Sequence, residues 1–568
     1  MNPVYHRMQG VADLAPVLYN FGIREVVICP GSRNVPLINS LVTYNKFNYI
    51  SLVDERSAAY FALGISQFSG NPVAIVSTSG TAVLNLSPAI AEAFYQGLPL
   101  VAITADRPAE WIDQADGQAI KQLGVFSNFV KIQVNLPVET INEDDLWNFK
   151  KLLSVALNSS IEEKAGPVHI NIPLREPLYD ILPELSLKSG YVRYNKSLNN
   201  HIDGIEYFKT KWNSYNRKMI IAGVNAGNEH LNEVLKKLSS SEDTVIIAEN
   251  ISNFKGDEFI SSPEVFFASL SDKELKNFIP QLIITVGEGI VSKRLKTFLR
   301  ENKVVEHWDI NNYGIQVPDT YKCLTSVIRI DSVAFLKEIS KISRNLKSDY
   351  ASIFRQNNEK LKYFTADFLK EAEFSDFKVV GEVFKIVPEN YIVQLANSTA
   401  VRLSQIFQTH QYLKYYSNRG TSGIDGCVST AAGSAFKSNQ PTLLIVSDLA
   451  FIYDSNGLWN SGLPKKLKIL LLNNEGGNIF RLIKTGEAYK NLSEYIETPH
   501  NINLGYLARA YGITYLYAEN ENEFLMHLDT FFKLEDTVVL EVKTEKEMNT
   551  HVIKSFYTEL QYEKMEEN

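Results

Sequence analysis

The chain has 568 residues, a formal net charge of −8, 45% hydrophobic residues and 21% charged residues. This is ordinary globular composition, which excludes a disordered or fibrous chain and, at about 100–200 residues per domain, predicts three or four domains. The net negative charge disfavours nucleic acid and anionic membranes as binding partners. No apolar run approaches the ~18 residues of a membrane span. The amino-terminal segment lacks the apolar core of a secretory signal, and Cys29, Cys323 and Cys427 are far apart in sequence. We therefore expect a cytoplasmic protein without membrane insertion.

The first 180 residues alternate between apolar strand patterns and helix patterns. Strands are predicted at residues 25–29, 73–77, 99–104 and 168–172, with helices between them at 55–68 and 86–97. Short strands that are apolar on both faces indicate a parallel sheet covered by helices on both sides. Loops at the carboxyl ends of such strands commonly carry ligand-binding groups. We predict a first domain over residues 1–182.

The same alternation returns twice after an irregular stretch near residues 179–203, which we interpret as a linker. The second set of strands is predicted at 219–223, 244–249, 282–287 and 304–310. A charged, helix-rich segment at 333–372 leads to the third set, at 391–396, 442–448, 468–474, 513–518 and 537–542. The predicted fold is α/β, with three consecutive doubly wound parallel-sheet domains over 1–182, 200–345 and 355–568.

The third domain contains the most specific motif. Asp448 follows one apolar strand, and Asn473 and Asn474 follow the next, with Gly476 and Gly477 after one intervening residue. Neighbouring parallel strands would bring these loops together. A carboxylate, an amide oxygen and a closely approaching backbone form an oxygen set suited to Mg²⁺. The alternative is a helix-capping aspartate and an unrelated tight turn.

This pair of motifs resembles the fingerprint of thiamine diphosphate-dependent enzymes, whose domains are named pyrimidine, central and pyrophosphate. Ser447 and Leu449 stand where that fingerprint usually has glycines. The resemblance implies that Asp448, Asn474 and the Gly476 carbonyl hold Mg²⁺, with Mn²⁺ as a substitute, against the diphosphate. It also implies that Glu55 is the carboxylate that activates the cofactor's pyrimidine ring. The alternative for Glu55 is an acidic first-turn residue that complements the helix dipole.

Eight segments in the same order narrow the resemblance to the 2-succinyl-5-enolpyruvyl-6-hydroxy-3-cyclohexene-1-carboxylate (SEPHCHC) synthase family of menaquinone biosynthesis. They occupy residues 29–37, 54–64, 78–94, 103–108, 117–126, 397–402, 417–433 and 473–480. Gly117 stands where that family often has asparagine. The resemblance covers all three predicted domains.

The resemblance implies two dicarboxylate substrates, 2-oxoglutarate and isochorismate. Arginine binds carboxylates through a planar fork, so basic residues in the strand-end loops are candidate substrate ligands. These candidates are Arg33, Arg107, Lys293, Arg294, Arg402 and Arg419. We assign Arg33 and Arg107 to isochorismate, and Arg402 and Arg419 to the oxoacid. The alternative for each is an ordinary surface charge.

Smaller side chains receive roles from the same correspondence. Ser32 and Gln118 would contact isochorismate or the reaction intermediate. Asn397 and Ser398 would hold the diphosphate or the oxoacid carboxylate. Ile424 would support the bent cofactor, with core packing as the alternative. An apolar wall is expected from Ile479, Phe480 and Ile483.

The implied reaction is decarboxylation of 2-oxoglutarate followed by conjugate addition of the resulting enamine to isochorismate. The first alternative is another thiamine diphosphate-dependent 2-oxoacid decarboxylase or carboligase. A nicotinamide oxidoreductase would need an intact GxGxxG, which we do not find. The third alternative is a catalytically inactive paralogue. The resemblance also implies a homodimer, and we expect a homotetramer.

Overall fold

The computed structural model describes residues 4–182, 186–188, 190–194, 204–224, 228–311, 317–342, 347–407, 410–460, 462–482 and 492–566. The chain forms two compact units. The first consists of Met1–Ser197, Asn418–Thr442 and Ala450–Leu467. The second consists of Leu198–Ser417, Leu443–Leu449 and Lys468–Asn568.

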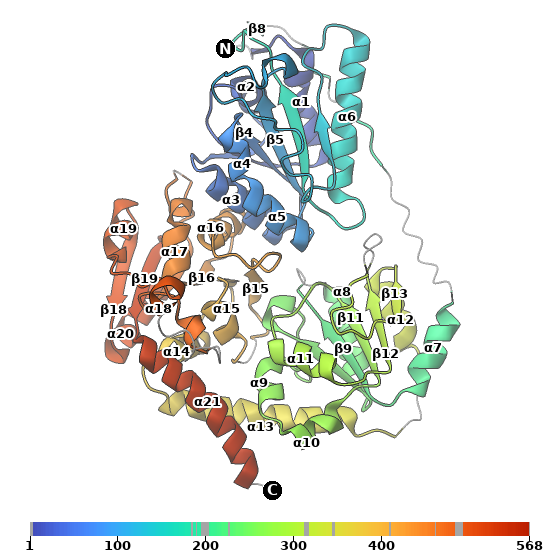
Figure 1. Cartoon of the computed structure of the whole chain (residues 1–568), viewed down its shortest axis with the longest axis vertical. Helices are drawn as coiled ribbons and strands as arrows, with labels where there is room; N and C mark the ends of the chain where they lie inside the picture. The colour runs from blue at the N-terminus through green and yellow to red at the C-terminus, as the bar shows by residue number, and fades with distance from the viewer. Residues whose placement is uncertain are drawn as a thin grey trace. The chain divides into compact units, whose positions relative to one another are not determined.

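The first unit contains a six-stranded sheet in the order β3-β2-β4-β5-β7-β6. Figure 1 labels its neighbouring strands β4 and β5. Its strands are β3 (Asn48–Ser51), β2 (Glu25–Ile28), β4 (Val73–Ser77), β5 (Leu100–Asp106), β7 (Val168–Pro173) and β6 (Gln133–Asn135). All neighbouring strands pair in parallel. One buried apolar cluster joins this sheet to α1 (Gln9–Phe21), α2 (Val35–Tyr44) and α6 (Glu143–Ile161). The short helix α4 (Thr81–Asn85) leads into α5 (Ser87–Gln96).

A close helix crossing fixes α3 (Glu55–Ser69) in the first unit. Its partner is α16 (Cys427–Lys437), from the third predicted domain. A Cβ atom added at Gly64 would lie 2.0 Å from the Thr430 carbonyl oxygen, and one added at Gly433 would lie 1.9 Å from the Phe61 carbonyl oxygen. Only glycine permits backbones to approach this closely. The sequence therefore places a glycine on each side of the crossing.

The amino terminus forms a small antiparallel pair. In it, β1 (Tyr5–His6) pairs with β8 (Ile181–Leu182). The structure differs here from the irregular linker expected from residue 179, because the backbone of β1 supplies hydrogen-bonding partners from the other end of the domain. Such a pairing leaves no local sequence pattern.

The second unit contains the five-stranded sheet β10-β9-β11-β12-β13, in which all neighbours are parallel. Its strands are β9 (Lys218–Ala222), β10 (Thr244–Ala248), β11 (Leu282–Val286), β12 (Glu306–Ile310) and β13 (Ser326–Ile328). One buried cluster joins it to α7 (Ile205–Ser214), α8 (Glu229–Ser239) and α12 (Ser332–Ser340). The helices α9 (Pro263–Ala268) and α11 (Lys293–Glu301) pack together, and α10 (Asp272–Leu275) follows α9 along the chain. The helix-rich segment predicted at 333–372 is confirmed by α12 and α13 (Tyr350–Glu371).

A third sheet has six strands in the order β15-β14-β16-β17-β19-β18. They are β14 (Ile392–Leu395), β15 (Lys414–Ser417), β16 (Thr442–Ser447), β17 (Leu467–Asn473), β18 (Thr514–Ala518) and β19 (Val538–Lys543). The accompanying helices are α14 (Asp376–Ile386), α15 (Thr399–Ser404), α17 (Asp448–Tyr453), α18 (Ser493–Ile496), α19 (Leu504–Ala510), α20 (Glu521–Lys533) and α21 (Lys546–Glu566).

The predicted fold class is confirmed, since the chain is α/β and contains three parallel sheets. Each of the strands predicted from apolar runs is present. The boundaries of the three domains stay a prediction. Within the described residues, no helix combines the length and the apolar character that crossing a membrane requires.

Candidate active site

In the first unit, predicted site residues follow the carboxyl ends of the parallel strands. The exposed Ser32 and the buried Arg33 come after β2, and Arg107 comes directly after β5. Arg33 donates to the Leu174 carbonyl oxygen at 3.1 Å and pairs with Glu176 at 3.0 Å. These bonds hold the guanidinium group in place.

Arg107 is fixed by its own loop. Its Nη2 donates to the Gly117 carbonyl oxygen at 2.9 Å, and its Nη1 lies 3.3 Å from Asp116 Oδ2. Burial raises the pKa of Asp106, and the charges of both Arg33 and Arg107 oppose that rise. Asp106 is thus a carboxylate near both arginines that the sequence analysis did not select.

Gln118 is exposed and has a positive φ of 56°. A Cβ at Gly80 would lie 3.1 Å from the Gln118 Cα, so glycine is needed where the loop after β4 passes Gln118. Gln122 accepts from the Gly80 N–H at 2.9 Å and donates to Asn171 at 2.9 Å. This buried network ties Gln118's loop to the carboxyl ends of β4 and β7.

Glu55 is the first residue of α3, and both of its neighbours are anchored. Asp54 caps the helix by accepting from the Ser57 N–H at 3.1 Å, and it also accepts from Asn456 at 2.8 Å. Arg56 donates to the Tyr453 carbonyl oxygen at 2.8 Å. The Glu55 carboxylate is half-buried, and the Asn85 amide donates to it at a long 3.4 Å.

Arg419 and Ile424 lie in a loop that the first unit holds on two sides. The fully buried carboxylate of Glu92 accepts from the backbone N–H groups of Gly420 and Thr421, each at 2.6 Å. At the other end, Tyr60 donates to Asp425 at 3.0 Å. The structure therefore brings Arg419 and Ile424 into the same compact unit as Glu55.

In the second unit, the two halves of the predicted metal motif meet. Asp448 begins α17 directly after β16, and its side chain is fully buried. Its Oδ2 accepts from the Gly476 N–H at 2.9 Å, and its Oδ1 accepts from the Leu449 N–H at 2.6 Å. The expected proximity of these two strand-end loops is confirmed.

The structure distinguishes the adjacent asparagines. Both ends of the Asn473 amide have partners, since it donates to Glu541 at 2.8 Å and accepts from the Glu475 N–H at 3.0 Å. Asn474 donates to Asp376 at 3.1 Å, whereas its buried Oδ1 has no hydrogen-bond partner among the described residues. A buried amide oxygen without a hydrogen-bond partner is a candidate ligand for a divalent cation.

Four side chains near this motif were missed by the sequence analysis. Burial raises the pKa of Asp376 to about 6, although Thr544 donates to its Oδ1 at 2.7 Å. The Asn549 amide oxygen accepts from the Asp376 N–H at 2.7 Å. His500 places Nε2 3.3 Å from Asp448 Oδ2. Among the described residues there is no cluster of three His, Cys, Asp or Glu side chains suited to a metal. A cation here would therefore depend on amide and carbonyl oxygens in addition to the Asp448 carboxylate.

A cavity of about 650 Å³ in the second unit brings several predicted residues together. It is lined by Lys293, Arg294 and Arg402, with Ile479 on its apolar side. Arg294 pairs with Glu264 at 3.6 Å, and its guanidinium lies 5.3 Å from the Tyr557 ring centre.

Helix α21 also lines this cavity and was not predicted to do so. Lys554 and Tyr557 come from this helix, and burial raises the pKa of the Tyr557 hydroxyl, which stays neutral. Asp376 and Asn549 lie on the wall of the same cavity. The cavity is thus lined by several basic side chains and reaches Asp376, the hydrogen-bond partner of Asn474.

The remaining predicted residues are placed as follows. Asn397 is buried, and Ser398 adopts a positive φ of 73° in the turn between β14 and α15. Phe480 is 42% exposed. Ile483 lies outside the described residues. The apolar wall expected from residues 479–483 is therefore represented in the cavity by Ile479.

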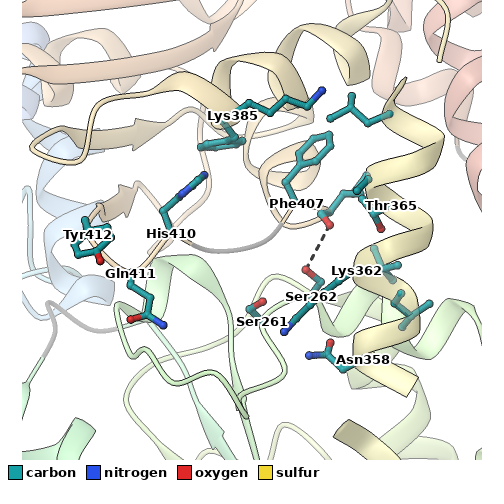
Figure 2. A pocket seen from close by; sticks show the side chains of 17 residues that line it. Ser261, Ser262, Asn358, Lys362, Thr365, Lys385, Phe407, His410, Gln411 and Tyr412 are labelled. Carbon is teal, nitrogen blue, oxygen red and sulfur yellow. Dashed lines mark hydrogen bonds between the residues drawn. The ribbon is translucent and has the colours of Figure 1, made fainter. Parts of the chain in front are cut away.

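A second cavity, of about 430 Å³, lies elsewhere in the second unit (Figure 2). Its basic side chains are compensated, since Lys362 pairs with Glu359 at 2.6 Å and Lys385 pairs with Glu382 at 2.7 Å. None of the predicted site residues that the structure describes lines this cavity. It is not part of the candidate active site.

Comparison with known proteins decides the family. The family "Thiamine pyrophosphate enzyme, N-terminal TPP binding domain" matches residues 8–125, and its C-terminal counterpart matches residues 397–542. A 2-succinyl-5-enolpyruvyl-6-hydroxy-3-cyclohexene-1-carboxylate synthase of Flavobacterium psychrophilum is 35% identical over 98% of this chain and 100% of its own length. That of Flavobacterium johnsoniae is 37% identical with the same coverage. The chain belongs to the SEPHCHC synthase family.

A further SEPHCHC synthase, of Porphyromonas gingivalis, is 37% identical over 98% of both chains. The matched regions include candidate residues of both units. Glu55, Arg107 and Gln118 fall within the amino-terminal match. Asn397, Asp448 and Asn474 fall within the carboxyl-terminal match. Membership of the SEPHCHC synthase family thus extends over both.

Proposed function

We propose that this chain catalyses the reaction for which its relatives are named, the formation of SEPHCHC from 2-oxoglutarate and isochorismate with release of CO₂. Full-length similarity to SEPHCHC synthases supports the proposal. The structural observation that supports it is the contact between Asp448 and the N–H of Gly476, which lies two residues after Asn474, whose buried Oδ1 has no hydrogen-bond partner among the described residues. The alternative of another 2-oxoacid decarboxylase lacks comparable support.

The residues of the second unit would hold a divalent cation, whose charge would favour binding of a diphosphate there. Asp448 and the Asn474 Oδ1 would hold Mg²⁺ or Mn²⁺, together with the Gly476 carbonyl. Thiamine diphosphate, when bound, supplies the electron sink for decarboxylation. In the first unit, Glu55 would hold a proton at the N1′ position of the pyrimidine ring.

The basic residues would orient the carboxylates of the two substrates. Lys293, Arg294 and Arg402 share one cavity, and their positive charge would attract a dicarboxylate there. Arg33 and Arg107, with Ser32 and Gln118, would serve isochorismate. For Arg33 and Arg107, hydrogen bonds to backbone carbonyl groups reduce the side-chain freedom lost on binding.

The expected assembly is a homodimer, with a homotetramer formed from two dimers. This expectation rests on the family resemblance, in which the two halves of a site come from different subunits. The same resemblance supports the three domain boundaries and Mg²⁺ as the metal. A cytoplasmic location agrees with the small, soluble substrates of the proposed reaction.

The proposal is tested by product analysis. The full-length protein is incubated with thiamine diphosphate, Mg²⁺, 2-oxoglutarate and isochorismate, and products are identified by mass spectrometry. SEPHCHC formation that depends on all four additions is the expected result. Succinic semialdehyde without consumption of isochorismate would identify the decarboxylase alternative. Absence of turnover in protein that binds thiamine diphosphate would indicate an inactive paralogue.

A further inference from the structure

Only one end of the Asn474 amide can serve a cation. The carbonyl oxygen is a ligand for hard cations, whereas the NH₂ group is a donor and is not. The two ends have nearly the same shape, so packing alone selects poorly between them. A function that needs Oδ1 on the metal side therefore needs a partner that fixes the NH₂ group on the other side.

Asp376 supplies that partner. Its Oδ2 accepts from the Asn474 Nδ2 at 3.1 Å. An ionised carboxylate only accepts, so a flipped amide would bring two oxygens together without a proton between them. Asp376 is 2% exposed and Asn474 is 3% exposed. Burial makes the wrong orientation costly, because its polar atoms would be left unpaired.

Asp376 is itself held from two elements. Thr544, which follows β19, donates to its Oδ1 at 2.7 Å. Asn549 of α21 accepts from its backbone N–H at 2.7 Å and donates to Thr544 at 2.9 Å. The first residue of α14 is thereby fixed relative to the loop that carries Asn474.

The neighbouring asparagine provides an internal comparison. Glu541 of β19 is 4% exposed and accepts from the Asn473 Nδ2 at 2.8 Å. The Asn473 Oδ1 is then used by the Glu475 N–H, whereas the Asn474 Oδ1 has no partner among the described residues. Two buried carboxylates thus orient two adjacent amides, but only the amide fixed by Asp376 leaves its oxygen available.

We propose that Asp376 is a positioning residue that orients the Asn474 amide so that its oxygen faces the divalent cation. This inference rests on the proposed function, since it requires the cation. Partners behind a metal ligand typically alter metal affinity about 10–100-fold when they are removed. Asp376→Ala should therefore weaken metal binding at least tenfold. Asp376→Asn keeps an acceptor oxygen for Nδ2 and should remain within about threefold of wild type.

The test measures binding of Mn²⁺ by electron paramagnetic resonance. The full-length protein is titrated in the presence of thiamine diphosphate and without substrates, and circular dichroism verifies folding. Glu541→Ala is the matched control, because it removes an equally buried carboxylate from the other asparagine. We expect Mn²⁺ affinity in this control within about threefold of wild type. A folded Asp376→Ala variant with wild-type affinity, or an equal loss in Glu541→Ala, overturns the proposal.

A second measurement separates positioning from general damage. Raising Mg²⁺ should restore turnover of Asp376→Ala to within about threefold of wild type, with the half-saturating Mg²⁺ concentration at least tenfold higher. Failure of Mg²⁺ to rescue a folded variant contradicts a positioning role. If Asp376→Ala does not fold, Thr544→Val is used in its place, because it removes the hydroxyl that donates to Asp376. This variant should weaken Mn²⁺ binding at least threefold. Wild-type affinity in that variant overturns the proposal. If the wild-type protein itself binds no Mn²⁺, the proposed function fails instead.

Discussion

Replacement of Gly64 by alanine tests the helix crossing that supports Glu55. The new methyl group would lie 2.0 Å from the Thr430 carbonyl oxygen, so the backbones would have to separate by about 1.4 Å to reach ordinary contact at 3.4 Å. Overpacking of this kind costs about 1–3 kcal/mol, and we expect the upper end because a backbone carbonyl cannot rotate away. Alanine recovers about 1 kcal/mol through its higher helix propensity.

The net loss of about 2 kcal/mol corresponds to a melting temperature lower by about 4–8 °C. Differential scanning calorimetry of the full-length protein measures it. Gly190→Ala is the matched control, because its added Cβ meets no atom of the described residues within 4 Å. Equal melting temperatures for Gly64→Ala and wild type would refute the reasoning. So would an equal drop in Gly190→Ala.

Three further predictions concern charge. Burial raises the pKa of Asp454 to about 7, so the folded chain keeps a proton that the unfolded chain loses near pH 4. The free energy of unfolding should therefore fall as the pH rises from 4 to 7. Asp454→Asn should reduce this pH dependence in denaturant titrations. Lys218 is fully buried and lies 2.7 Å from Asp243, so Lys218→Met should lower the free energy of unfolding by about 3–5 kcal/mol in urea. The double variant with Asp243→Ala should recover part of this loss. Arg107→Ala should release CO₂ from 2-oxoglutarate at a near-normal single-turnover rate but form little product with isochorismate, whereas Arg402→Ala should slow CO₂ release itself. Loss of the same step in both arginine variants would refute the division between the two substrates.

Sequence patterns predict best where local signals and burial agree. The run at residues 73–77 is β4, and all five of its residues are buried. The meeting of Asp448 with Gly476 was predictable because β16 and β17 are neighbours in a parallel sheet. By contrast, the sequence patterns did not predict β3 and β15. Both are edge strands of four residues with exposed positions, so their apolar pattern is weak.

The side chains that surround the candidate ligands could not be predicted from such local patterns. Asp376 contacts Asn474 across 98 positions, and Asn549 contacts Asp376 across 173. In sequence, Asp376 follows Ser375 at the start of a helix, where an acidic residue is ordinary. Lys554 lies on a charged terminal helix and is equally inconspicuous. Contacts between distant elements depend on the tertiary fold, and one sequence shows no pattern for them.

The distribution of the candidate residues between the two units separates cofactor binding from cofactor activation. Asp448 and Asn474 belong to the second unit, and Glu55 begins a helix of the first. Asp448→Ala removes the only carboxylate of the oxygen set and should abolish tight binding of thiamine diphosphate in calorimetry. Glu55→Gln keeps that set intact, so thiamine diphosphate should still bind. Exchange of the cofactor's C2 proton should slow at least about tenfold, which corresponds to a barrier higher by roughly 1.4 kcal/mol. Unchanged exchange by nuclear magnetic resonance would remove Glu55 from the mechanism. Wild-type affinity in Asp448→Ala would remove the metal assignment, so each variant tests one role without the other.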